Sequence, residues 1–167
     1  MSQTRCYLGL GSNLNDPFSQ LQQALQALEA VPGIRVSTVS AFYRSLPIGP
    51  GEQPDYCNAV AEISTHLNPV DLLHSLQNIE RAQGRDRKTG PRWSARTLDI
   101  DVLLYGDAII DLDHLTVPHP EMADRNFVLV PLADIAPDLE VPGLGVVRVL
   151  AESAGCEGLQ RWDESPA

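Results

Sequence analysis

Residues 98–105 form the segment that most constrains the fold, because apolar side chains alternate there with two aspartates. Alternation with a period of two predicts a β-strand with one buried face, since successive side chains on a strand point to opposite sides. The side chains expected in the core are those of Leu98, Ile100, Val102 and Leu104. Asp99 and Asp101 are then expected to stand together on the other face, so this strand carries both part of a core and a candidate site.

The paired aspartates allow two interpretations. At a rise of about 3.3 Å per residue their Cα atoms lie about 6.5 to 7 Å apart, and two carboxylates held this close repel unless a positive group lies between them. Their oxygens suit Mg²⁺, which commonly takes one or two carboxylates and completes its shell with water and substrate phosphate. The alternative is a pair of solvent-facing acids on a half-exposed strand, and Asp99 and Asp101 alone do not decide between the two.

The cationic residues are concentrated next to this strand. The chain has 12 Lys and Arg residues against 22 Asp and Glu, for a formal net charge of −10, and half of the cations lie in residues 81–96. They are Arg81, Arg85, Arg87, Lys88, Arg92 and Arg96. A solvated charge run is one explanation. The other is a phosphate-binding loop, because guanidinium groups grip phosphate oxygens through paired hydrogen bonds.

The basic stretch ends at Arg96, three residues before Asp99. Carboxylates and arginines around one cleft are what magnesium-dependent phosphoryl transfer from a nucleotide requires, because positioning and charge neutralisation do most of the catalysis there. The sequence contains no Gly-x-x-x-x-Gly-Lys-Ser/Thr motif, which excludes a P-loop enzyme. The negative net charge argues against a partner that is a long nucleic acid.

Periodicity together with Gly and Pro predicts the remaining elements. Strands are expected at residues 4–10, 34–43, 56–65 and 98–105. Helices are expected to begin at Asp16-Pro17 and Asn68-Pro69 and to end at Pro32-Gly33 and Gly84. The order β-α-β-β-α-β predicts the α+β class with a ferredoxin-like core. A C-terminal extension follows, and the segments outside the core are expected as loops at 44–55, 85–95 and 116–122 and helices at 127–135 and 146–153.

Length and composition agree with one soluble unit. A chain of 167 residues is long enough to bury a core, so residues 1–167 are expected to form a single domain. No apolar run approaches the roughly 20 residues needed to cross a bilayer, and residues 1–5 do not start a secretory signal. Cys6, Cys57 and Cys156 are widely spaced and odd in number, so we expect reduced packing residues and a cytoplasmic location.

Two further stretches offer contacts for a substrate. Tyr56 and Asn58 open the third expected strand with a ring and an amide, and an amide can both donate to and accept from the edge of a heteroaromatic ring. The alternative is that both are core or turn residues. His119 lies between two prolines and is either structural or a donor to phosphate, and Arg125 and Phe127 follow on the same stretch.

Several motifs occur in a distinctive order and spacing. They are Gly11-Ser12-Asn13, Phe42-Tyr43-Arg44, Gln53-Pro54-Asp55-Tyr56 with Asn58, residues 80–87, residues 96–101 and Leu115-Thr116-Val117-Pro118-His119. With them, residues 8–142 closely resemble the 6-hydroxymethyl-7,8-dihydropterin pyrophosphokinase family of the folate pathway. The resemblance implies a ferredoxin-like α+β catalytic domain that moves pyrophosphate from Mg-ATP to the hydroxymethyl group of 6-hydroxymethyl-7,8-dihydropterin and releases AMP.

The resemblance also implies roles for individual residues. Asp99 and Asp101 match the acids that hold two Mg²⁺ ions, and Arg85 and Arg96 match the residues closest to the transferring group. The positions that match ATP contacts are Gln77, Glu80, Arg87, Arg92, Trp93, Val102, His119 and Arg125. The positions that match the pterin pocket are Ser45, Ile48, Tyr56, Asn58 and Phe127. No residue stands out as a general base, and a bound metal can acidify the attacking hydroxyl instead.

The chain departs from the family pattern at a few positions. Ser94-Ala95 stands where many relatives have Gly-Pro, and residues 89–91 make this loop about one residue longer than in some of them. Pro120 replaces a frequent aromatic, and His114 replaces a frequent arginine. These differences bear on loop closure and on ATP contacts, and they leave the metal site and the pterin pocket intact.

Three alternatives stay open from the sequence. Another magnesium-dependent phosphoryl or nucleotidyl transferase would release pyrophosphate rather than AMP. A non-catalytic RNA-binding module needs a basic face and exposed aromatic side chains on the sheet, whereas aromatic residues make up 5% of this chain. An inactive relative would not be expected to keep both acids and the loop arginines. We therefore expect a monomer that acts on ATP and the pterin, without a nucleic-acid or membrane partner.

Overall fold

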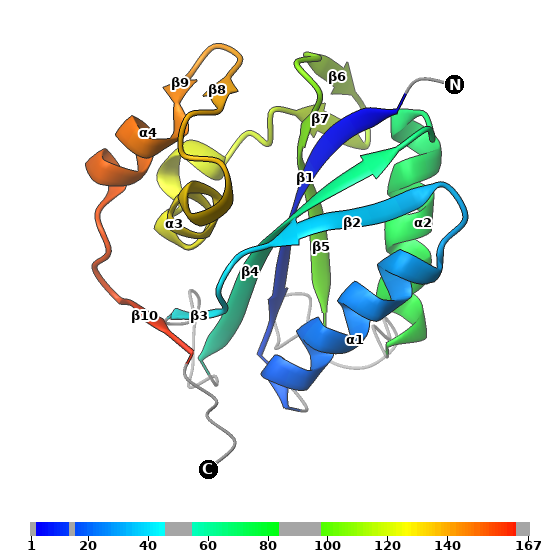
Figure 1. Ribbon diagram of the computed structural model, residues 1–167, viewed down its shortest axis with the longest axis horizontal. Coiled ribbons are helices and arrows are strands. Elements are labelled where there is room, and N and C mark those ends of the chain that lie inside the picture. Colours follow the sequence, from blue (N-terminus) through cyan, green and yellow to red (C-terminus); the bar gives the residue numbers. More distant parts are fainter. Residues whose placement is uncertain (1–2, 14–15, 46–54, 84–97, 163–167) are drawn as a thin grey trace.

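The computed structural model describes residues 3–13, 16–45, 55–83 and 98–162. Its centre is a six-stranded antiparallel sheet (Figure 1). The strands are β1 (Thr4–Ser12), β2 (Ile34–Val39), β3 (Tyr43–Ser45), β4 (Tyr56–Thr65), β5 (Asp99–Tyr105) and β10 (Leu159–Arg161). They are ordered β10-β3-β4-β1-β5, and β2 also pairs with β4. The chain therefore belongs to the mixed class of helices with an antiparallel sheet.

Two helices connect the outer strands to the centre and begin as the sequence predicts. Helix α1 (Pro17–Ala30) is capped by Asp16, whose carboxylate accepts from the Ser19 backbone N–H, and α2 (Pro69–Ala82) is capped in the same way by Asn68. A side-chain oxygen at this position satisfies a backbone donor that the first turn leaves without a partner, and proline suits the first turn because it lacks that donor.

The sheet has a hydrophobic core on each face. Helices α1 and α2 cover one face, where Leu8, Leu28 and Leu76 are among the buried residues. Helices α3 (Asn126–Ile135) and α4 (Val147–Ala154) lie on the opposite side, as Figure 1 shows, and Leu129 and Val147 are buried there. A strand in a sheet that is covered on both faces needs apolar side chains pointing to each face, and β5 has them.

The expected strand at 98–105 is present, but one of its core assignments is wrong. Leu98, Ile100 and Val102 are buried on the α1/α2 face as predicted, whereas Leu104 is buried on the α3/α4 face. The pairing of β1 with β5 shifts between Tyr7 and Leu8, because β5 has one extra residue at this point. Such a bulge reverses the alternation beyond it, and a strict period of two cannot anticipate it.

The expected strand at 34–43 is in fact two strands. β2 ends at Val39 and β3 begins at Tyr43, and both pair with β4. Between them the Ser40 hydroxyl donates to the Ala41 carbonyl and accepts from the Val60 N–H, so a side chain replaces part of the regular ladder. β3 also includes Arg44 and Ser45, so the expected loop at 44–55 is wrong at its first two residues.

The C-terminal part contains more structure than the sequence indicates. The expected helices correspond to α3 and α4. The expected loop at 116–122 is wrong in part, because it overlaps a strand and the start of a short 3-10 helix. The unpredicted elements are β6 (Ile110–Leu112), β7 (Leu115–Val117), the 3-10 helix η1 (Met122–Asp124), β8 (Glu140–Val141), β9 (Gly145–Val146) and β10. Strand β10 joins the central sheet by pairing with β3.

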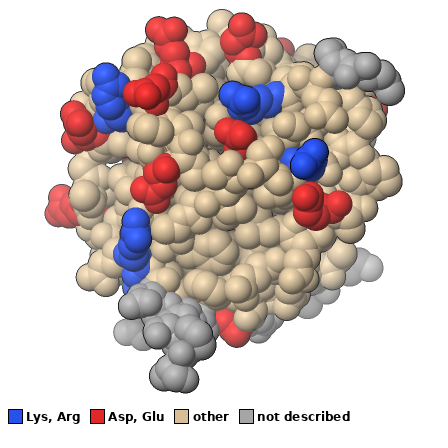
Figure 2. Space-filling model, viewed as in Figure 1, with Lys and Arg blue, Asp and Glu red and all other residues tan. Residues whose placement is uncertain are grey.

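The surface and the cysteines add two observations. On the face drawn in Figure 2, acidic and basic side chains are interspersed, without a broad area of one sign. Within the described residues, none of the helices has the length and apolar character of a membrane span.

All three cysteines are free thiols, and Cys6 and Cys57 are buried as expected. Cys156 is exposed, so its assignment as a packing residue is wrong.

Candidate active site

A cavity of about 260 Å³ lies between the sheet and the start of α3. It is lined by Gly9, Leu10, Gly11, Ser45, Tyr56, Asn58, Ala59, Asp99, Asp101, Arg125, Phe127 and Val128. These residues come from β1, β3, β4 and β5 on one side and from the segment entering α3 on the other. The cavity combines apolar and aromatic walls with a few polar groups, which is typical of a small-molecule site.

Two glycines explain why this part of the sheet is hollow. Gly9 and Gly11 alternate along β1 and both line the cavity, so neither contributes a side chain that would fill it. In the register of the sheet they lie opposite Asp101 and Asp99 respectively. A Cβ atom on Gly11 would lie 3.2 Å from Oδ1 of Asn58, which is tighter than an ordinary contact. Glycine here allows a ligand or a neighbouring side chain to approach the backbone closely.

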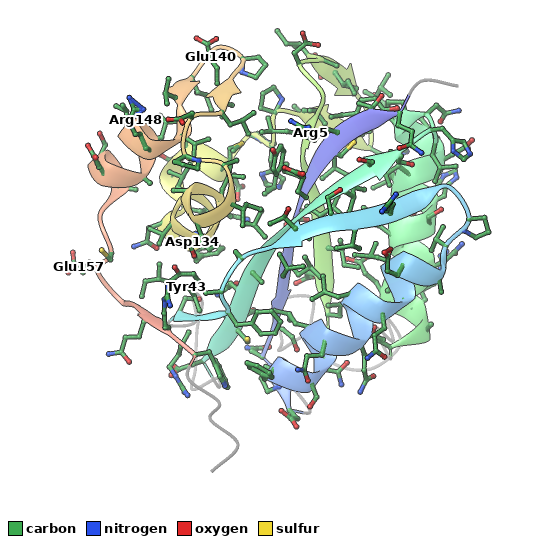
Figure 3. All side chains as sticks on the ribbon, viewed as in Figure 1. Arg5, Tyr43, Asp134, Glu140, Arg148 and Glu157 are labelled. Atoms are coloured by element: carbon green, nitrogen blue, oxygen red, sulfur yellow. The ribbon has the colours of Figure 1, made fainter. Side chains whose placement is uncertain are left out.

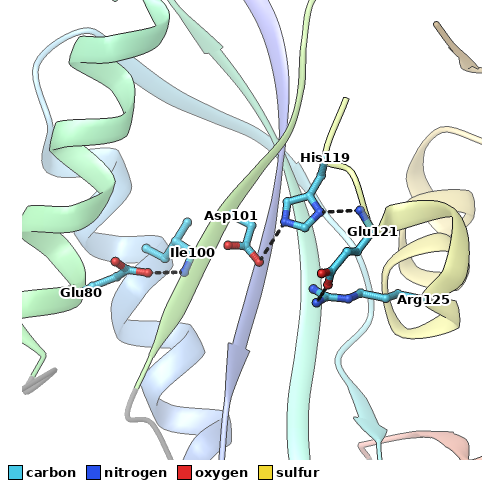
Figure 4. A network of polar contacts seen from close by, with 6 residues as sticks. All are labelled: Glu80, Ile100, Asp101, His119, Glu121 and Arg125. Atoms are coloured by element: carbon cyan, nitrogen blue, oxygen red, sulfur yellow. Dashed lines mark hydrogen bonds and ion pairs between the residues drawn. The ribbon is translucent and has the colours of Figure 1, made fainter. Parts of the chain in front are cut away.

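Asp99 and Asp101 stand on the cavity side of β5, with Ile100 pointing into the opposite core. The backbone between them is anchored from α2. Glu80 is only 5% exposed, and its Oε2 accepts a hydrogen bond from the Ile100 N–H at 2.8 Å (Figure 4). A buried carboxylate that bonds to the backbone of a strand fixes that backbone in place. Glu80 therefore supports the aspartate pair from the other side of the strand.

His119 approaches the pair from the loop after β7. Its backbone N–H donates to the Leu103 carbonyl at 3.0 Å, which ties this loop to β5. Its Nδ1 accepts from the Glu121 N–H at 3.2 Å, so the proton of the neutral imidazole lies on Nε2. Nε2 is 4.0 Å from Oδ2 of Asp101, as drawn in Figure 4. The arrangement presents an N–H donor beside the carboxylate.

Arg125 and Phe127 form the wall contributed by the start of α3. The guanidinium carbon of Arg125 lies 5.5 Å from the centre of the Phe127 ring, and the group also pairs with Glu121 (Figure 4). A ring below and a carboxylate beside the guanidinium hold it at the cavity. One cation thus lies across the cavity from two anions.

Asn58 and Ser45 form the polar floor at the other end of the cavity. Asn58 is 5% exposed, and its Nδ2 donates to the Ser45 hydroxyl at 2.6 Å. This bond assigns which end of the amide faces Ser45 and leaves Oδ1 on the side of Gly11. Tyr56 lines the same region, so a planar polar ligand would meet rings and an amide edge together.

The aspartate pair is the part of the site that fits a metal ion. Within the described part of the chain, no group of three or more His, Cys, Asp and Glu side chains is arranged to hold one. Two carboxylates from one strand provide only part of a coordination shell. That is the protein share that Mg²⁺ commonly takes, because it keeps several waters and binds substrate phosphate.

Comparisons with known proteins identify the family. The family model described as 7,8-dihydro-6-hydroxymethylpterin-pyrophosphokinase matches residues 7–137. The chain belongs to this family. A 2-amino-4-hydroxy-6-hydroxymethyldihydropteridine pyrophosphokinase of Haemophilus influenzae is 50% identical over 146 residues, covering 87% of this chain and 90% of the relative. The protein of the same description from Pseudomonas aeruginosa is 48% identical over 157 residues, covering 94% and 96%.

Solved structures agree on the fold. The Plasmodium falciparum HPPK-DHPS wild type with pterin and p-hydroxybenzoate aligns with a TM-score of 0.74 at 14% identity. The alignment covers 96% of this chain and 46% of that longer one. A second structure, Plasmodium falciparum HPPK-DHPS A437G with SDX-DHP, gives the same TM-score of 0.74 at 14% identity, and the alignment covers 96% of this chain and 49% of that one. The pyrophosphokinase fold is therefore shared with proteins whose sequences have diverged widely.

Most of the candidate residues that the structure describes lie together in this chain. Those that line the cavity are Asp99, Asp101, Ser45, Tyr56, Asn58, Arg125 and Phe127. His119 and Glu80 are linked to Asp101 and Ile100 respectively. Gln77 is half-buried on α2, and the side chain of Val102 is buried in the core on the opposite face. The remaining candidates, Ile48, Arg85, Arg87, Arg92, Trp93 and Arg96, lie outside the described residues.

Some residues of the cavity were not predicted from the sequence. Ala59 and Val128 complete the lining, and their small or apolar side chains carry no chemical signal. Gly9 and Gly11 did carry one, since glycine at alternate positions of a strand leaves one face bare. Gly11 enters the sequence motifs only as part of Gly11-Ser12-Asn13, and Gly9 enters none of them.

Proposed function

We propose that this protein transfers a pyrophosphoryl group from ATP to the hydroxymethyl group of 6-hydroxymethyl-7,8-dihydropterin, as a step of folate biosynthesis. The substrate hydroxyl attacks the β-phosphorus, the bond between that phosphorus and the oxygen bridging to the α-phosphate breaks, and AMP leaves while the hydroxyl proton is released. The observation that carries the proposal is that an aspartate pair, an amide and two aromatic residues line one cavity in a chain of this family.

The described residues divide the cavity into two ends. Asp99 and Asp101 would hold the magnesium at one end, and we assign two ions to them. Mg²⁺ bound there would neutralise phosphate charge and favour loss of the hydroxyl proton. Asn58 reads the edge of the pterin at the other end, because its carbonyl oxygen accepts from ring N–H groups, and Tyr56 and Phe127 contact the ring faces.

Two further groups act on the phosphates in this proposal. The Nε2–H of His119 and the guanidinium of Arg125 donate to phosphate oxygens of ATP, which adds positive potential where negative charge is transferred. Arg85 and Arg96 are proposed nearest to the transferring group, with Gln77, Glu80, Arg87, Arg92, Trp93 and Val102 on the nucleotide side. Backbone groups of Ser45 and Ile48 are proposed to complete the pterin pocket.

We also propose the domain organisation, the oligomeric state and the location of the enzyme. Residues 1–167 act as one catalytic domain with a ferredoxin-like core, monomeric and cytoplasmic. The strand neighbours β2-β4-β1-β5, with α1 and α2 on one face, support the ferredoxin-like assignment. Strand β10 supports a single unit, because it joins the same sheet from the far end of the described chain.

The test is to incubate the purified protein with Mg-ATP and 6-hydroxymethyl-7,8-dihydropterin and to measure AMP by chromatography. We expect AMP only when the pterin is present, and none from an Asp99→Ala/Asp101→Ala variant. A matched control is Asp111→Ala/Asp113→Ala, which removes two exposed carboxylates at the same spacing from the β6–β7 hairpin. Release of pyrophosphate instead would indicate a nucleotidyl transferase, and no pterin-dependent product from folded protein would overturn the substrate assignment.

A further inference from the structure

The segment Glu157–Trp162, here called the β10 segment, lies beyond residue 137, where the match to the family model ends. It contains no residue that lines the cavity. Figure 3 shows Glu157 at its start and Tyr43 on the neighbouring strand. The segment nevertheless contacts both walls of the pterin end of the cavity, the start of α3 and strand β3.

Its contact with α3 includes a hydrogen bond at the first residue of that helix. Nδ2 of Asn126 donates to the Glu157 carbonyl at 3.0 Å. Asn126 is the first residue of α3 and lies between Arg125 and Phe127, both of which line the cavity. Because neighbouring residues share a backbone, this bond restrains the position of the wall that carries the cation and the ring.

Its contact with β3 is a strand pairing reinforced by side chains. Leu159–Arg161 pair with Tyr43–Ser45, and the Trp162 N–H donates to the Phe42 carbonyl at 2.8 Å. The Arg44 guanidinium lies 4.0 Å above the Trp162 ring. β3 would otherwise be a three-residue edge strand, and such a strand has few contacts of its own to define its position.

Arg44 connects the β10 segment to residues next to the cavity. While stacked on Trp162, it also pairs with the Asp55 carboxylate at 3.4 Å. Asp55 directly precedes Tyr56, and Ser45 directly follows Arg44, and both of these neighbours line the cavity. One guanidinium thus joins the β10 segment to the two stretches of backbone that hold Ser45 and Tyr56.

We propose that Trp162 and Arg44 are positioning residues for the pterin, acting through Ser45, Asn58 and Tyr56 without touching the substrate. This inference rests on the proposed function. When the Trp162–Arg44 contact is lost, the two stretches of backbone sample other positions, and the fraction of molecules with a competent pocket falls. Apparent affinity for the pterin falls by that same fraction. The aspartate end is held by β1 and α2 instead, so ATP binding and the chemical step do not depend on this contact.

The test compares Trp162→Ala and Arg44→Met with the wild-type full chain. The KM for the pterin should rise by about fivefold, the scale expected for loss of one cation–π contact. The KM for ATP and kcat should not change. Trp162→Phe keeps a ring under the guanidinium and should restore the pterin KM to near the wild-type value. A loss of stability alone would not separate the two substrates in this way.

A matched control is Arg148→Met on α4. Arg148 also pairs with an aspartate, Asp138, at the same 3.4 Å separation, but it does not line the cavity, and none of the described aromatic rings lies against its guanidinium. It should change none of the kinetic constants. Melting temperatures of all variants show whether each is folded at the assay temperature, and binding of 6-hydroxymethylpterin is measured directly by fluorescence.

The outcomes separate this inference from the proposed function. An active wild type with unchanged pterin KM and pterin affinity in both variants overturns the role of Trp162 and Arg44 alone. A parallel rise in the KM for ATP, or a fall in kcat, also overturns it, because the effect would not be confined to the pterin end. A wild type that neither turns over nor binds the pterin overturns the proposed function, and this inference with it.

Discussion

The two faces of the central sheet are built from the same strands and differ in almost every other respect. The α1/α2 face is a continuous apolar core in which Leu8, Ile100 and Val102 are buried. The α3/α4 face has a smaller core, and beside it the cavity bounded by Asp99 and Asp101. On one side of β5 the alternate residues hold the fold together, and on the other they form the candidate active site.

The difference between the faces shows how a small protein can carry two acids at alternate positions of β5, an edge strand of its central sheet. Asp destabilises a strand relative to branched residues, and two of them require compensation. The α1/α2 face supplies it through packing of Ile100 and Val102, and Glu80 secures the backbone between the acids with a buried hydrogen bond. Packing on one face therefore offsets the free-energy cost of the two acids on the other.

The largest expected effect is on activity, and it is tested by substituting Asp101 and its neighbour Ile100, whose side chains point to opposite faces of the sheet. Asp101→Asn keeps the size of the side chain and removes its charge, so kcat/KM should fall by about 10²- to 10³-fold, as for other groups that stabilise transferred charge. Its side chain is 47% exposed, so the free energy of unfolding should change by no more than about 0.5 kcal/mol. Urea unfolding and steady-state AMP formation measure both quantities.

Ile100→Val is the matched change on the opposite face. Removal of one buried methylene should lower the free energy of unfolding by about 0.5–1.5 kcal/mol and leave kcat/KM of the folded protein unchanged. The division between the faces would be wrong if Ile100→Val reduced kcat/KM as strongly as Asp101→Asn does.

Glu80 connects the two faces, and its removal should affect both, to a smaller extent. Glu80→Ala leaves the buried Ile100 N–H without this acceptor, which costs about 1–3 kcal/mol of unfolding free energy. Loss of the anchor between the two acids should also lower kcat by about tenfold, as substitution of groups that orient metal ligands commonly does. Both quantities are measured as for Asp101→Asn.

Two variants show whether the Glu80 effect depends on the hydrogen bond. Glu80→Gln retains an oxygen that can accept from the Ile100 N–H, so it should recover most of the lost stability. Asn78→Ala, on the exposed side of the same helix, should alter neither quantity. If Glu80→Ala lowered stability and left kcat unchanged, Glu80 would belong to the core and not to the site.

The sequence predicted the parts of this protein in which local patterns act alone. The strand at 98–105 and the caps at Asp16 and Asn68 depend on neighbouring residues, and all three are confirmed. The strands it misjudged depend on distant partners. β10 exists because it pairs with β3, and the bulge that turns Leu104 to the other face depends on the pairing of β5 with β1.

The candidate site shows the same division. The charge and spacing of Asp99 and Asp101 are visible in the sequence. Asn58 and His119 were candidates from the sequence as well, and the resemblance to the family chose a binding role for them over a structural one. The support for these residues is not visible in the same way. The position of Glu80 under Ile100 arises from a contact between two separate elements, α2 and β5. The tautomer that the Glu121 N–H imposes on His119 arises from the conformation of the loop that holds both residues.

A further expected effect concerns alkaline stability and distinguishes the faces by their titrating groups. Burial raises the pKa of Cys6, on the α1/α2 face, to about 12. On the α3/α4 face, burial is the largest cause that raises the pKa of Tyr43, and its hydrogen bond to Asp134 adds to it. Burial likewise raises the pKa of Tyr7, and its hydrogen bond to Glu62 adds to it. Each of these groups is neutral when protonated and charged when it loses its proton, and burial disfavours the charged form. The folded state therefore holds the proton more tightly than the unfolded state does.

The sign of the pH dependence follows from these raised pKa values. The stability from each group is complete below its unfolded pKa, about 8.5 for Cys and about 10 for Tyr, and is lost as pH rises from there toward the folded pKa. Cys6→Ala should therefore flatten the decline from about pH 8.5 upward. Tyr43→Phe should flatten it only above about pH 10, by at most about 1.4 kcal/mol per pH unit.

Tyr43→Phe also removes the 2.5 Å hydrogen bond from β3 to Asp134 of α3, which should cost about 1–3 kcal/mol at neutral pH. Urea midpoints measured from pH 7 to pH 11 separate this constant loss from the change in slope. A slope above pH 10 equal to that of the wild type would mean that Tyr43 ionises as easily in the folded as in the unfolded chain. The bond to Asp134 would then be too weak to help hold β3 against α3, on the face where the cavity lies.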